Sequence, residues 1–300
     1  MCQPWGGGLS GFSEVDVLRR KSRAFLTRIR GRMASTLNVT VRVDGLPPFR
    51  FATHAVRDSY ISTTIRGGGL WEPNETHVLR RMLRPGDFVI DIGANIGWHT
   101  VIAALAVGPS GRVIAFEPGA ANASVLRKNV LANQLCQVDV RQAAVSDHDG
   151  VGRLYLSPSN LGDHRLDAPE SGRDTETVEV CALASVLTAE GRAPALIKID
   201  AQGSESRILG AIDAARLNST AILVEFWPHG LQRAGSNGAH LAQILAALGH
   251  HIYIIDHWSP GLKPTDPVEL AARASSNLSP ATDASVDLLC IPSGHPLPLL

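Results

Sequence analysis

The sequence predicts an α/β protein built on a mostly parallel β-sheet with helices on both faces. From residue 88 onward, short apolar segments of strand length alternate with segments of helical period. The helical segments are long enough to connect neighbouring parallel strands, as in βαβ units. The chain has 300 residues, 44% of them hydrophobic, which is enough to bury a sheet core without disulfides or a metal.

Residues 1–70 do not follow this alternation and are predicted to form an N-terminal extension. Residues 1–35 are glycine-rich and then basic, which favours an irregular leader followed by a short helix. The alternating segments LNVTVRV and FRFATH flank the turn residues GLPP, a pattern typical of a β-hairpin. We therefore divide the chain into an extension, residues 1–70, and a main domain, residues 71–300.

The main domain is predicted to begin with a helix and to continue with seven strands. The helix ETHVLRRMLR (75–84) ends at a Pro-Gly pair. The expected strands are FVIDIG, RVIAFEP (112–118), QVDVRQAAV (137–145), ALIKID (195–200), TAILVEF (220–226), HIYIID (251–256) and VDLLCIP (286–292). Helices are expected over residues 96–107, 121–133, 205–216 and around 241–248.

Two segments interrupt the alternation of strand and helix. GRLYLS (152–157) and TVEVCAL (177–183) flank a polar loop and predict an inserted antiparallel strand pair. Residues 259–284 are rich in Pro, Ser and Ala and predict a loop with a short helix.

The composition argues against several classes of partner. Lys and Arg together number 28, as do Asp and Glu together, so the formal net charge is +0. This balance gives no support to general electrostatic binding of nucleic acid or of an anionic membrane. The four cysteines are scattered, which favours reduced thiols in a cytoplasmic protein over disulfides or a metal site. No apolar run approaches the roughly 20 residues that span a bilayer, and no signal-peptide pattern is expected.

The segment VIDIGANIGWHT (89–100) places an acid and two glycines where a strand gives way to a helix. Ligands of open parallel sheets bind at the carboxyl ends of the strands, which is where Asp91 and Gly93 lie. Gly93 and Gly97 permit a tight turn and close approach of a ligand to the backbone. The helix that follows offers unpaired N–H groups. The segment therefore predicts a site for a nucleotide-like cofactor.

The spacing of these residues favours S-adenosylmethionine over a dinucleotide. The glycines are spaced G-x-x-x-G rather than G-x-G-x-x-G, and Asp91 suits a cationic amino group rather than a pyrophosphate. Glu117 lies 20 residues after Gly97 at the end of the second strand, the usual position of an acid that binds ribose hydroxyls. Adenine is expected near residues 143–147, at the end of the third strand.

Four segments, VIDIGANIGWHT, VIAFEP, LRKNVLAN and IKIDAQGSESRILGA, resemble the FkbM family of S-adenosylmethionine-dependent methyltransferases. The resemblance covers residues 70–230, and its most specific part is the K-I-D-x-x-G-x-E pattern at residues 198–205. It implies a class I methyltransferase (Rossmann-like) fold and O-methylation of a hydroxyl on a sugar or secondary metabolite. The residues that it assigns to the cofactor are Asp91, Gly93, Asn95, Gly97, Glu117 and Ser146.

Lys198 and Asp200 are the candidate catalytic pair. They lie two residues apart on the fourth strand, so their side chains face the same way at the edge where an acceptor is expected. A neutral hydroxyl is a poor nucleophile, so Asp200 is a candidate for the base or for the group that orients the hydroxyl. The alternative role of Asp200 is to cap the turn before Gly203. Lys198 is expected to lower the hydroxyl pKa or to pair with Asp200.

Several further residues are candidates for the acceptor side. Glu225 ends the fifth strand, and the loop SNLGDHRL, with Asn160 and His164, is expected to fold over the acceptor. His99 is a candidate base or a residue of the pocket wall, whereas Glu205 is expected to be a first-turn charge of a helix. Trp71 and Glu72 are candidates for one lip of the pocket.

Other classes of protein stay open at this point. A nucleic-acid or other N-methyltransferase shares the cofactor half, but this chain has IDAQG where an Asn/Asp-Pro-Pro-aromatic motif is expected. An NAD-dependent oxidoreductase needs the other glycine spacing. A non-catalytic binding module of the same fold is the remaining alternative. The acceptor is expected to be a small molecule or carbohydrate and not a nucleic acid, and the oligomeric state, a homodimer included, stays open.

Overall fold

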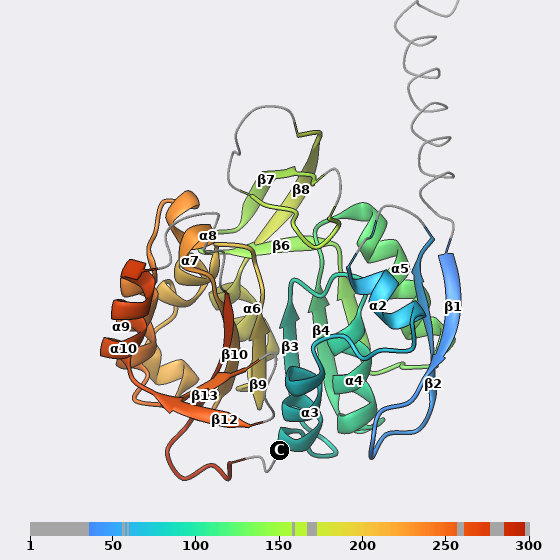
Figure 1. Ribbon diagram of the computed structural model, residues 1–300, viewed down its shortest axis with the longest axis horizontal. Coiled ribbons are helices and arrows are strands. Elements are labelled where there is room, and N and C mark those ends of the chain that lie inside the picture. Colours follow the sequence, from blue (N-terminus) through green and yellow to red (C-terminus); the bar gives the residue numbers. More distant parts are fainter. Residues whose placement is uncertain are drawn as a thin grey trace, which may run out of the picture.

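The computed structural model describes residues 36–55, 58, 60–157, 160–166, 173–256, 261–276 and 285–297 of the chain. The leader and helix predicted within residues 1–35 lie outside this part. Figure 1 shows a central sheet with helices on both sides and a smaller sheet near one end of its strands. The predicted α/β class is thereby confirmed.

The central sheet has eight strands in the order β12-β11-β13-β10-β9-β3-β4-β5. Seven of them fall within the predicted strand segments, namely β3 (Phe88–Ile92), β4 (Arg112–Phe116), β5 (Val138–Arg141), β9 (Leu196–Ile199), β10 (Ala221–Phe226), β11 (His251–Ile255) and β13 (Val286–Ile291). The eighth, β12 (Leu262–Thr265), is an antiparallel edge strand next to β11. The prediction of seven strands is therefore wrong by one. The missed strand contains Pro264, and a proline usually indicates a loop, but an edge strand tolerates one.

The strand order reverses between β3 and β9. β3 pairs in parallel with β4 on one side and with β9 on the other. The chain runs outward from β3 through β4 to β5, and later from β9 to β10 in the opposite direction. Connections that leave the carboxyl ends on either side of such a reversal diverge and open a crevice. Asp91 of β3 and Lys198 of β9 are direct partners across this boundary.

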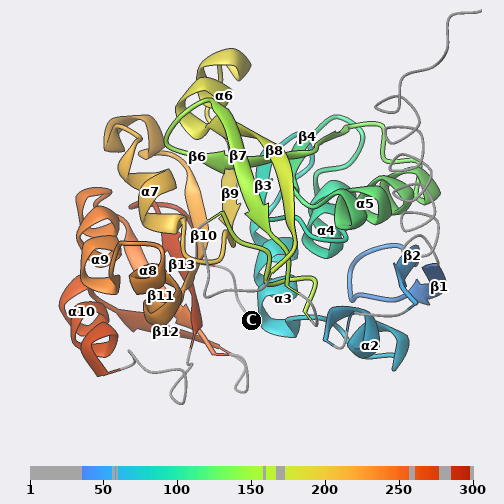
Figure 2. The ribbon, with the colours of Figure 1, turned by 90° about the horizontal axis from the view of Figure 1, so that it is seen from above.

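Alternation of side chains along the strands divides the core between the two faces of the sheet. In β3, Phe88, Ile90 and Ile92 pack with residues of α6, α7, α9 and α10, whereas Val89 packs with residues of α3 and α4. The helices are α3 (Pro73–Met82), α4 (Trp98–Val107), α5 (Ala120–Ala132), α6 (Leu183–Glu190), α7 (Glu205–Gly210), α8 (Pro228–Arg233), α9 (Gly238–Ala247) and α10 (Pro267–Ser276). Figure 2 shows α7, α9 and α10 on one side of the sheet and α4 and α5 on the other.

Several helices differ from the sequence expectation, and α8 has no counterpart in it. α7 ends at Gly210 instead of continuing to Arg216, because the Asp213 carboxylate accepts the Ala215 N–H and starts a 3₁₀ turn over Ala214–Leu217. α6 has no counterpart in the prediction, since it follows the inserted strands directly. Within the described part of the chain, no helix is long and apolar enough to cross a bilayer. The cytoplasmic location stays a prediction.

The predicted N-terminal hairpin is confirmed as β1 (Thr36–Val41) and β2 (Phe49–His54), and the short helix α2 (Ile61–Arg66) follows it. Phe49 and Phe51 pack on Trp98 of α4, with ring centroids 6.1 and 5.4 Å from the indole. The side-chain amide of Asn129 in α5 accepts the Ala52 N–H and donates to the Ala52 carbonyl. The hairpin therefore shares the core of the central sheet, and a domain boundary at residue 70 stays a prediction.

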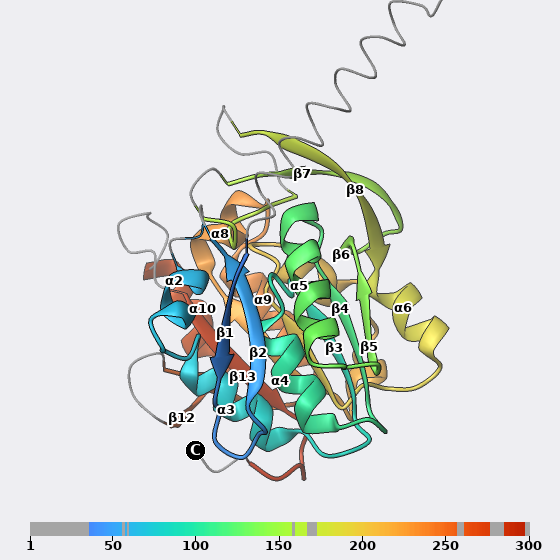
Figure 3. The same cartoon turned by 90° about the vertical axis from the view of Figure 1, so that its right-hand side faces the viewer.

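The predicted inserted strand pair is confirmed as β7 (Gly150–Tyr155) and β8 (Thr175–Ala182), which are antiparallel. The predicted third strand, residues 137–145, divides into β5 of the central sheet and β6 (Ala143–Ser146), which pairs with β8. The segment QVDVRQAAV contains no Gly or Pro, so only the change of pairing partner reveals the break. Figures 1 and 3 show the resulting three-stranded sheet near the carboxyl ends of β3 and β4.

Candidate active site

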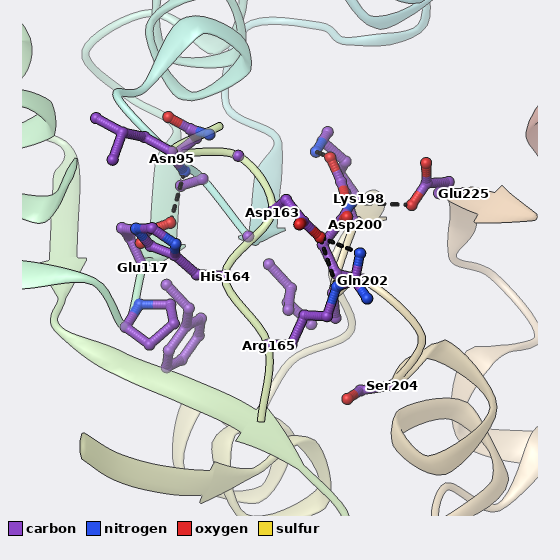
Figure 4. A pocket seen from close by; sticks show the side chains of 18 of the residues that line it. Asn95, Glu117, Asp163, His164, Arg165, Lys198, Asp200, Gln202, Ser204 and Glu225 are labelled. Carbon is purple, nitrogen blue, oxygen red and sulfur yellow. Dashed lines mark hydrogen bonds and ion pairs between the residues drawn. The ribbon is translucent and has the colours of Figure 1, made fainter. Parts of the chain in front are cut away.

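A cavity of about 400 Å³ opens where the crevice between β3 and β9 is expected. Its wall includes residues that follow β3, β4, β9 and β10, together with residues 160–166 from the insertion. Figure 4 shows the side chains that line it. The predicted site residues on its wall are Gly93, Asn95, Glu117, Asn160, His164, Lys198, Asp200 and Glu225. Asp91, Gly97 and Ser146 do not line it.

The turn after β3 needs its glycines. Gly93 has φ +78°, and a Cβ at this position would lie 1.8 Å from the Asp200 carbonyl oxygen. Gly97 has φ +92° and precedes α4, where a Cβ would lie 2.4 Å from a Leu126 methyl. Asn95 between them also has a positive φ of 52°, and its N–H donates to the Glu117 carboxylate at 2.9 Å. The turn therefore brings β3, β4 and β9 together at one point.

Asp91 lies next to the cavity in the sequence but is almost completely buried, with 2% of its surface exposed. Its Oδ2 accepts the Thr100 hydroxyl at 2.5 Å, while its Oδ1 has no hydrogen-bond partner among the described residues. Burial raises the pKa of Asp91, and the charge of Lys198 opposes that rise. An acceptor oxygen is thus left unsatisfied beside the glycine turn.

Glu117 is held by backbone donors at the end of β4. Its carboxylate accepts the N–H groups of Asn95 and Gly119 at 2.9 and 2.8 Å. Burial raises the pKa of Glu117 to about 7, although these backbone hydrogen bonds lower it in part. The residue is therefore a carboxylate that changes protonation near neutral pH and lies on the cavity wall.

Ser146 is the predicted adenine contact that the structure does not bring to the cavity. Its hydroxyl donates to Asp147 at 3.0 Å, and the residues of the same strand that do line the cavity are Ala143, Ala144 and Val145. The departure of β6 from the central sheet explains the difference. The expected adenine region is therefore apolar in this structure.

Four polar side chains form a connected row at the ends of β9 and β10. Lys198 Nζ lies 3.5 Å from Asp200 Oδ2, and Gln202 Nε2 donates to Asp200 Oδ1 at 2.8 Å and to Glu225 Oε2 at 3.1 Å. Figure 4 shows this row on the side of the cavity away from Glu117. Gln202 has a φ of 52°, a conformation that non-glycine residues rarely adopt. Backbone strain of this kind is concentrated at functional sites.

The row carries one cation and two acids, with Asp91 close by. Burial opposes the charge of Lys198, but the carboxylates of Asp200 and Asp91 outweigh it and raise the pKa of the ammonium. Burial, and after it the charge of Asp200, raise the pKa of Glu225 well above the ordinary glutamate value. Lys198 therefore stays charged and stabilises an ionised neighbour, whereas Glu225 favours its protonated form.

His164 lies on the cofactor side of the cavity rather than beside Asp200. A Cβ on Gly119 would lie 3.0 Å from the His164 ring and 2.9 Å from Glu117 Oε1, so the imidazole adjoins the Glu117 carboxylate. His164 Nδ1 accepts the Ser157 N–H at 3.1 Å. Burial lowers the pKa of His164 to about 4, so it is neutral at physiological pH. Asn160 closes a turn of the same loop by accepting the Gly162 N–H.

Glu205 and His99 have mainly structural contacts. Glu205 is fully buried and accepts the N–H groups of Ala201 and Gly203, so it caps the turn that carries Gln202. His99 lies on the cavity wall with its Nε2 3.6 Å from a Glu72 oxygen, and burial lowers its pKa well below the ordinary histidine value. The predicted lip residues Trp71 and Glu72 also line the cavity.

Sequence reasoning missed three prominent residues of the wall, Asp163, Arg165 and Trp227. Arg165 and Asp163 form an ion pair, and the Arg165 guanidinium carbon lies 4.9 Å from the centre of the Trp227 ring. The charged pair in GDHRL was a visible signal in the loop. Its contact with Trp227 depends on tertiary structure alone.

Comparison with known proteins identifies the family. The Methyltransferase FkbM domain matches residues 91–252 of this chain. The chain belongs to the FkbM methyltransferase family. It is therefore an S-adenosylmethionine-dependent methyltransferase, as the resemblance in the sequence predicted. It is 30% identical to 31-O-demethyl-FK506 methyltransferase FkbM of Streptomyces tacrolimicus over 231 residues, which are 65% of this chain and 83% of that protein.

Solved structures of low sequence identity resemble the chain. One is M. jannaschii TYW2 in complex with AdoMet, which is 11% identical with a TM-score of 0.41, and the match covers 86% of each chain. Another is a SAM-dependent O-methyltransferase from Thermotoga maritima, 14% identical with a TM-score of 0.41, covering 86% of this chain and 79% of the other.

The residues of the FkbM-family cavity fit S-adenosylmethionine. The cavity volume of about 400 Å³ lies in the range of small-molecule sites. Glu117 on the cavity wall would accept ribose hydroxyls. Asp91 does not line the cavity, although its unsatisfied Oδ1 lies next to the glycine turn. Ala143, Ala144 and Val145 would provide an apolar surface for adenine. The individual roles of these residues stay predictions.

Cofactor affinity is expected to depend on pH through Glu117. Its pKa of about 7 means that the carboxyl is mostly protonated at pH 6 and mostly ionised at pH 8 in the free protein. Ribose hydroxyls donate to the ionised form, so binding of S-adenosylhomocysteine should be about tenfold weaker at pH 6 than at pH 8. Isothermal titration at both values measures this ratio.

Glu117→Gln is the control for this effect, because glutamine does not titrate. Its affinity should be lower and the same at both pH values. His164 does not interfere, since its pKa of about 4 keeps it neutral throughout this range. A pH dependence that persists in Glu117→Gln would assign the titration to another group.

Proposed function

We propose that this methyltransferase transfers a methyl group to a hydroxyl oxygen of a sugar or secondary metabolite. The row Lys198–Asp200–Gln202–Glu225 is the observation that supports this proposal most directly. It lines the cavity on the side away from Glu117, so an acceptor there would face the cofactor. The named activity of the Streptomyces relative, which is a 31-O-demethyl-FK506 methyltransferase, is consistent with a hydroxyl acceptor.

The bound cofactor supplies a methyl group activated on a sulfonium. The protein then has to hold the acceptor oxygen in line with it, and such positioning contributes about 7–11 kcal/mol to lowering a barrier. Asp200 accepts the hydroxyl proton, a step typically worth roughly 10²–10⁴ in rate. The charge of Lys198, 3.5 Å away, stabilises the ionised carboxylate that this step requires.

Gln202 and Glu225 orient the acceptor. The Gln202 amide donates to both carboxyl groups and so fixes the direction of the Asp200 oxygens. Glu225 favours its protonated form and can therefore donate a hydrogen bond to a second oxygen of the acceptor. A polyhydroxylated molecule offers such neighbouring oxygens.

A panel of acceptors tests the proposal. Release of S-adenosylhomocysteine is measured with monosaccharides, hydroxylated metabolites, amines and RNA oligonucleotides, and the product is examined by NMR for an O-methyl signal. We expect turnover with hydroxyl compounds alone. Methylation of nitrogen or RNA would favour the alternative methyltransferase classes. A folded protein that binds no S-adenosylhomocysteine would favour the non-catalytic module.

A further inference from the structure

Arg165 is a buried cation on the cavity wall that the proposed mechanism does not use. Only 8% of its surface is exposed, and it lines the same cavity as Asp200. Its Nη1 has no hydrogen-bond partner among the described residues. A buried guanidinium nitrogen without a partner loses the hydrogen bonds of water and gains none in return. A ligand that supplies an acceptor oxygen would remove this deficit.

The backbone around Arg165 determines the direction of its side chain. Arg165 and Tyr155 exchange backbone hydrogen bonds of 2.7 and 3.1 Å, so this part of the loop is extended. Neighbouring side chains of an extended segment point in opposite directions. His164 accordingly adjoins Glu117, whereas Arg165 lies over the face of Trp227, just beyond β10. In Figure 4, Arg165 lies toward Gln202 and away from Glu117.

The ion-pair partner of Arg165 also pairs with a second guanidinium group. Asp163 is the ion-pair partner of Arg165, but it also accepts Arg173 Nη2 at 2.6 Å. One carboxylate is therefore shared between two guanidinium groups. Burial lowers the pKa of Arg165, and although Asp163 raises it, the charge of nearby Arg233 on α8 lowers it further. The single charge of Asp163 therefore does not neutralise both guanidinium groups.

We propose that Arg165 binds a carboxylate or phosphate group of the acceptor, so that the natural acceptor is an acid that also carries the methylated hydroxyl. A guanidinium presents its donors in the planar arrangement that suits these oxyanions. Trp227 holds the plane in place from one side. This inference rests on the proposed function, because it concerns the acceptor end of that site.

The charges in the cavity also restrict where the anionic group of the acceptor can lie relative to the methylated hydroxyl. Asp200 would repel an anionic group placed directly against it, and Lys198 is already paired with Asp200. The anionic group therefore lies at Arg165, separated from the hydroxyl that faces Asp200. Uronic acids and sugar phosphates are compounds with this arrangement.

The experiment uses the full chain saturated with S-adenosylhomocysteine. Saturation-transfer NMR measures binding of D-glucuronate and of D-glucose, its neutral counterpart, at constant ionic strength, and inorganic phosphate is added as a competitor. We expect glucuronate to bind at least about tenfold more tightly than glucose. In Arg165→Met this preference should vanish, while affinity for S-adenosylhomocysteine stays within about threefold of the original value.

Arg192→Met is the matched control. The Arg192 guanidinium carbon also lies over an aromatic ring, 4.8 Å from the centre of Phe88, but Arg192 does not line the cavity. The Arg192→Met variant should therefore keep the preference for glucuronate over glucose. Displacement of glucuronate by phosphate would show that both groups use Arg165, and binding without displacement would assign the site to carboxylates.

Equal binding of glucuronate and glucose by the original protein, or an undiminished preference in Arg165→Met, would overturn the proposal. If Arg165→Met no longer binds S-adenosylhomocysteine, Arg165→Lys decides, because lysine keeps the charge. A retained preference for glucuronate in that variant supports the proposal, and its loss overturns it. Failure of the original protein to bind S-adenosylhomocysteine would instead count against the proposed function.

Discussion

Asp200→Asn is expected to lower kcat by about 100-fold or more while the protein still binds its cofactor. A general base typically contributes roughly 10²–10⁴ in rate, and asparagine cannot accept the hydroxyl proton. The amide oxygen can still accept the Gln202 hydrogen bond, which is 2.8 Å long in the original protein. Loss of function would therefore reflect the missing charge rather than a collapsed site. The measurement is kcat and KM with the acceptor that the panel identifies, together with titration of S-adenosylhomocysteine.

Asp139→Asn is a suitable control for this variant. Asp139 also pairs with a cation, Arg141, at 2.9 Å, but it belongs to a partly exposed group of charges and does not line the cavity. Surface ion pairs contribute little to stability, so the variant should stay folded. Because Asp139 does not line the cavity, kcat should be unchanged. If Asp200→Asn and Asp139→Asn have the same kcat, Asp200 is not the base, and its role is to cap the turn before Gly203.

The sequence was sufficient to place the local part of the cavity wall. The positions of Gly93, Asn95 and Glu117 follow from strand ends and a glycine turn, which are properties of short segments. The turn after β9, with Lys198 and Asp200, is local in the same sense. Such patterns can be recognised because the backbone conformation that they need, as at Gly93 with φ +78°, restricts the residues that fit.

The residues that sequence reasoning misplaced depend on contacts between distant segments. Ser146 lies away from the cavity because β6 pairs with β8, and no Gly or Pro in residues 137–146 marks the change of sheet. His164 was expected beside the acceptor, yet the extended loop turns it toward Glu117. The stacking of Arg165 on Trp227 joins the insertion to β10, and neither segment alone indicates it.

Gly93→Ala is expected to have the largest effect on stability. A Cβ at residue 93 would lie 1.8 Å from the Asp200 carbonyl oxygen. The backbone on both sides is fixed, because these residues directly follow the paired residues Ile92 and Ile199. No rotamer change relieves such a clash, so β3 and β9 would have to separate at the cofactor site. We expect the free energy of unfolding to fall by more than about 4 kcal/mol, and binding of S-adenosylhomocysteine to be lost. Urea unfolding and isothermal titration measure the two effects.

Gly191→Ala separates the clash from the backbone conformation. Gly191, which ends α6, also has a positive φ, +64°, in the left-handed helical region, but a Cβ there would meet no atom within 4 Å. It should therefore cost only about 1–2 kcal/mol, the amount by which a left-handed conformation is unfavourable for alanine. The difference between the two variants isolates the contact between Gly93 and Asp200. Equal stability of the two variants would mean that the ends of β3 and β9 are not held together as closely as the structure shows. Equal binding of S-adenosylhomocysteine would mean that the cofactor site does not depend on this contact.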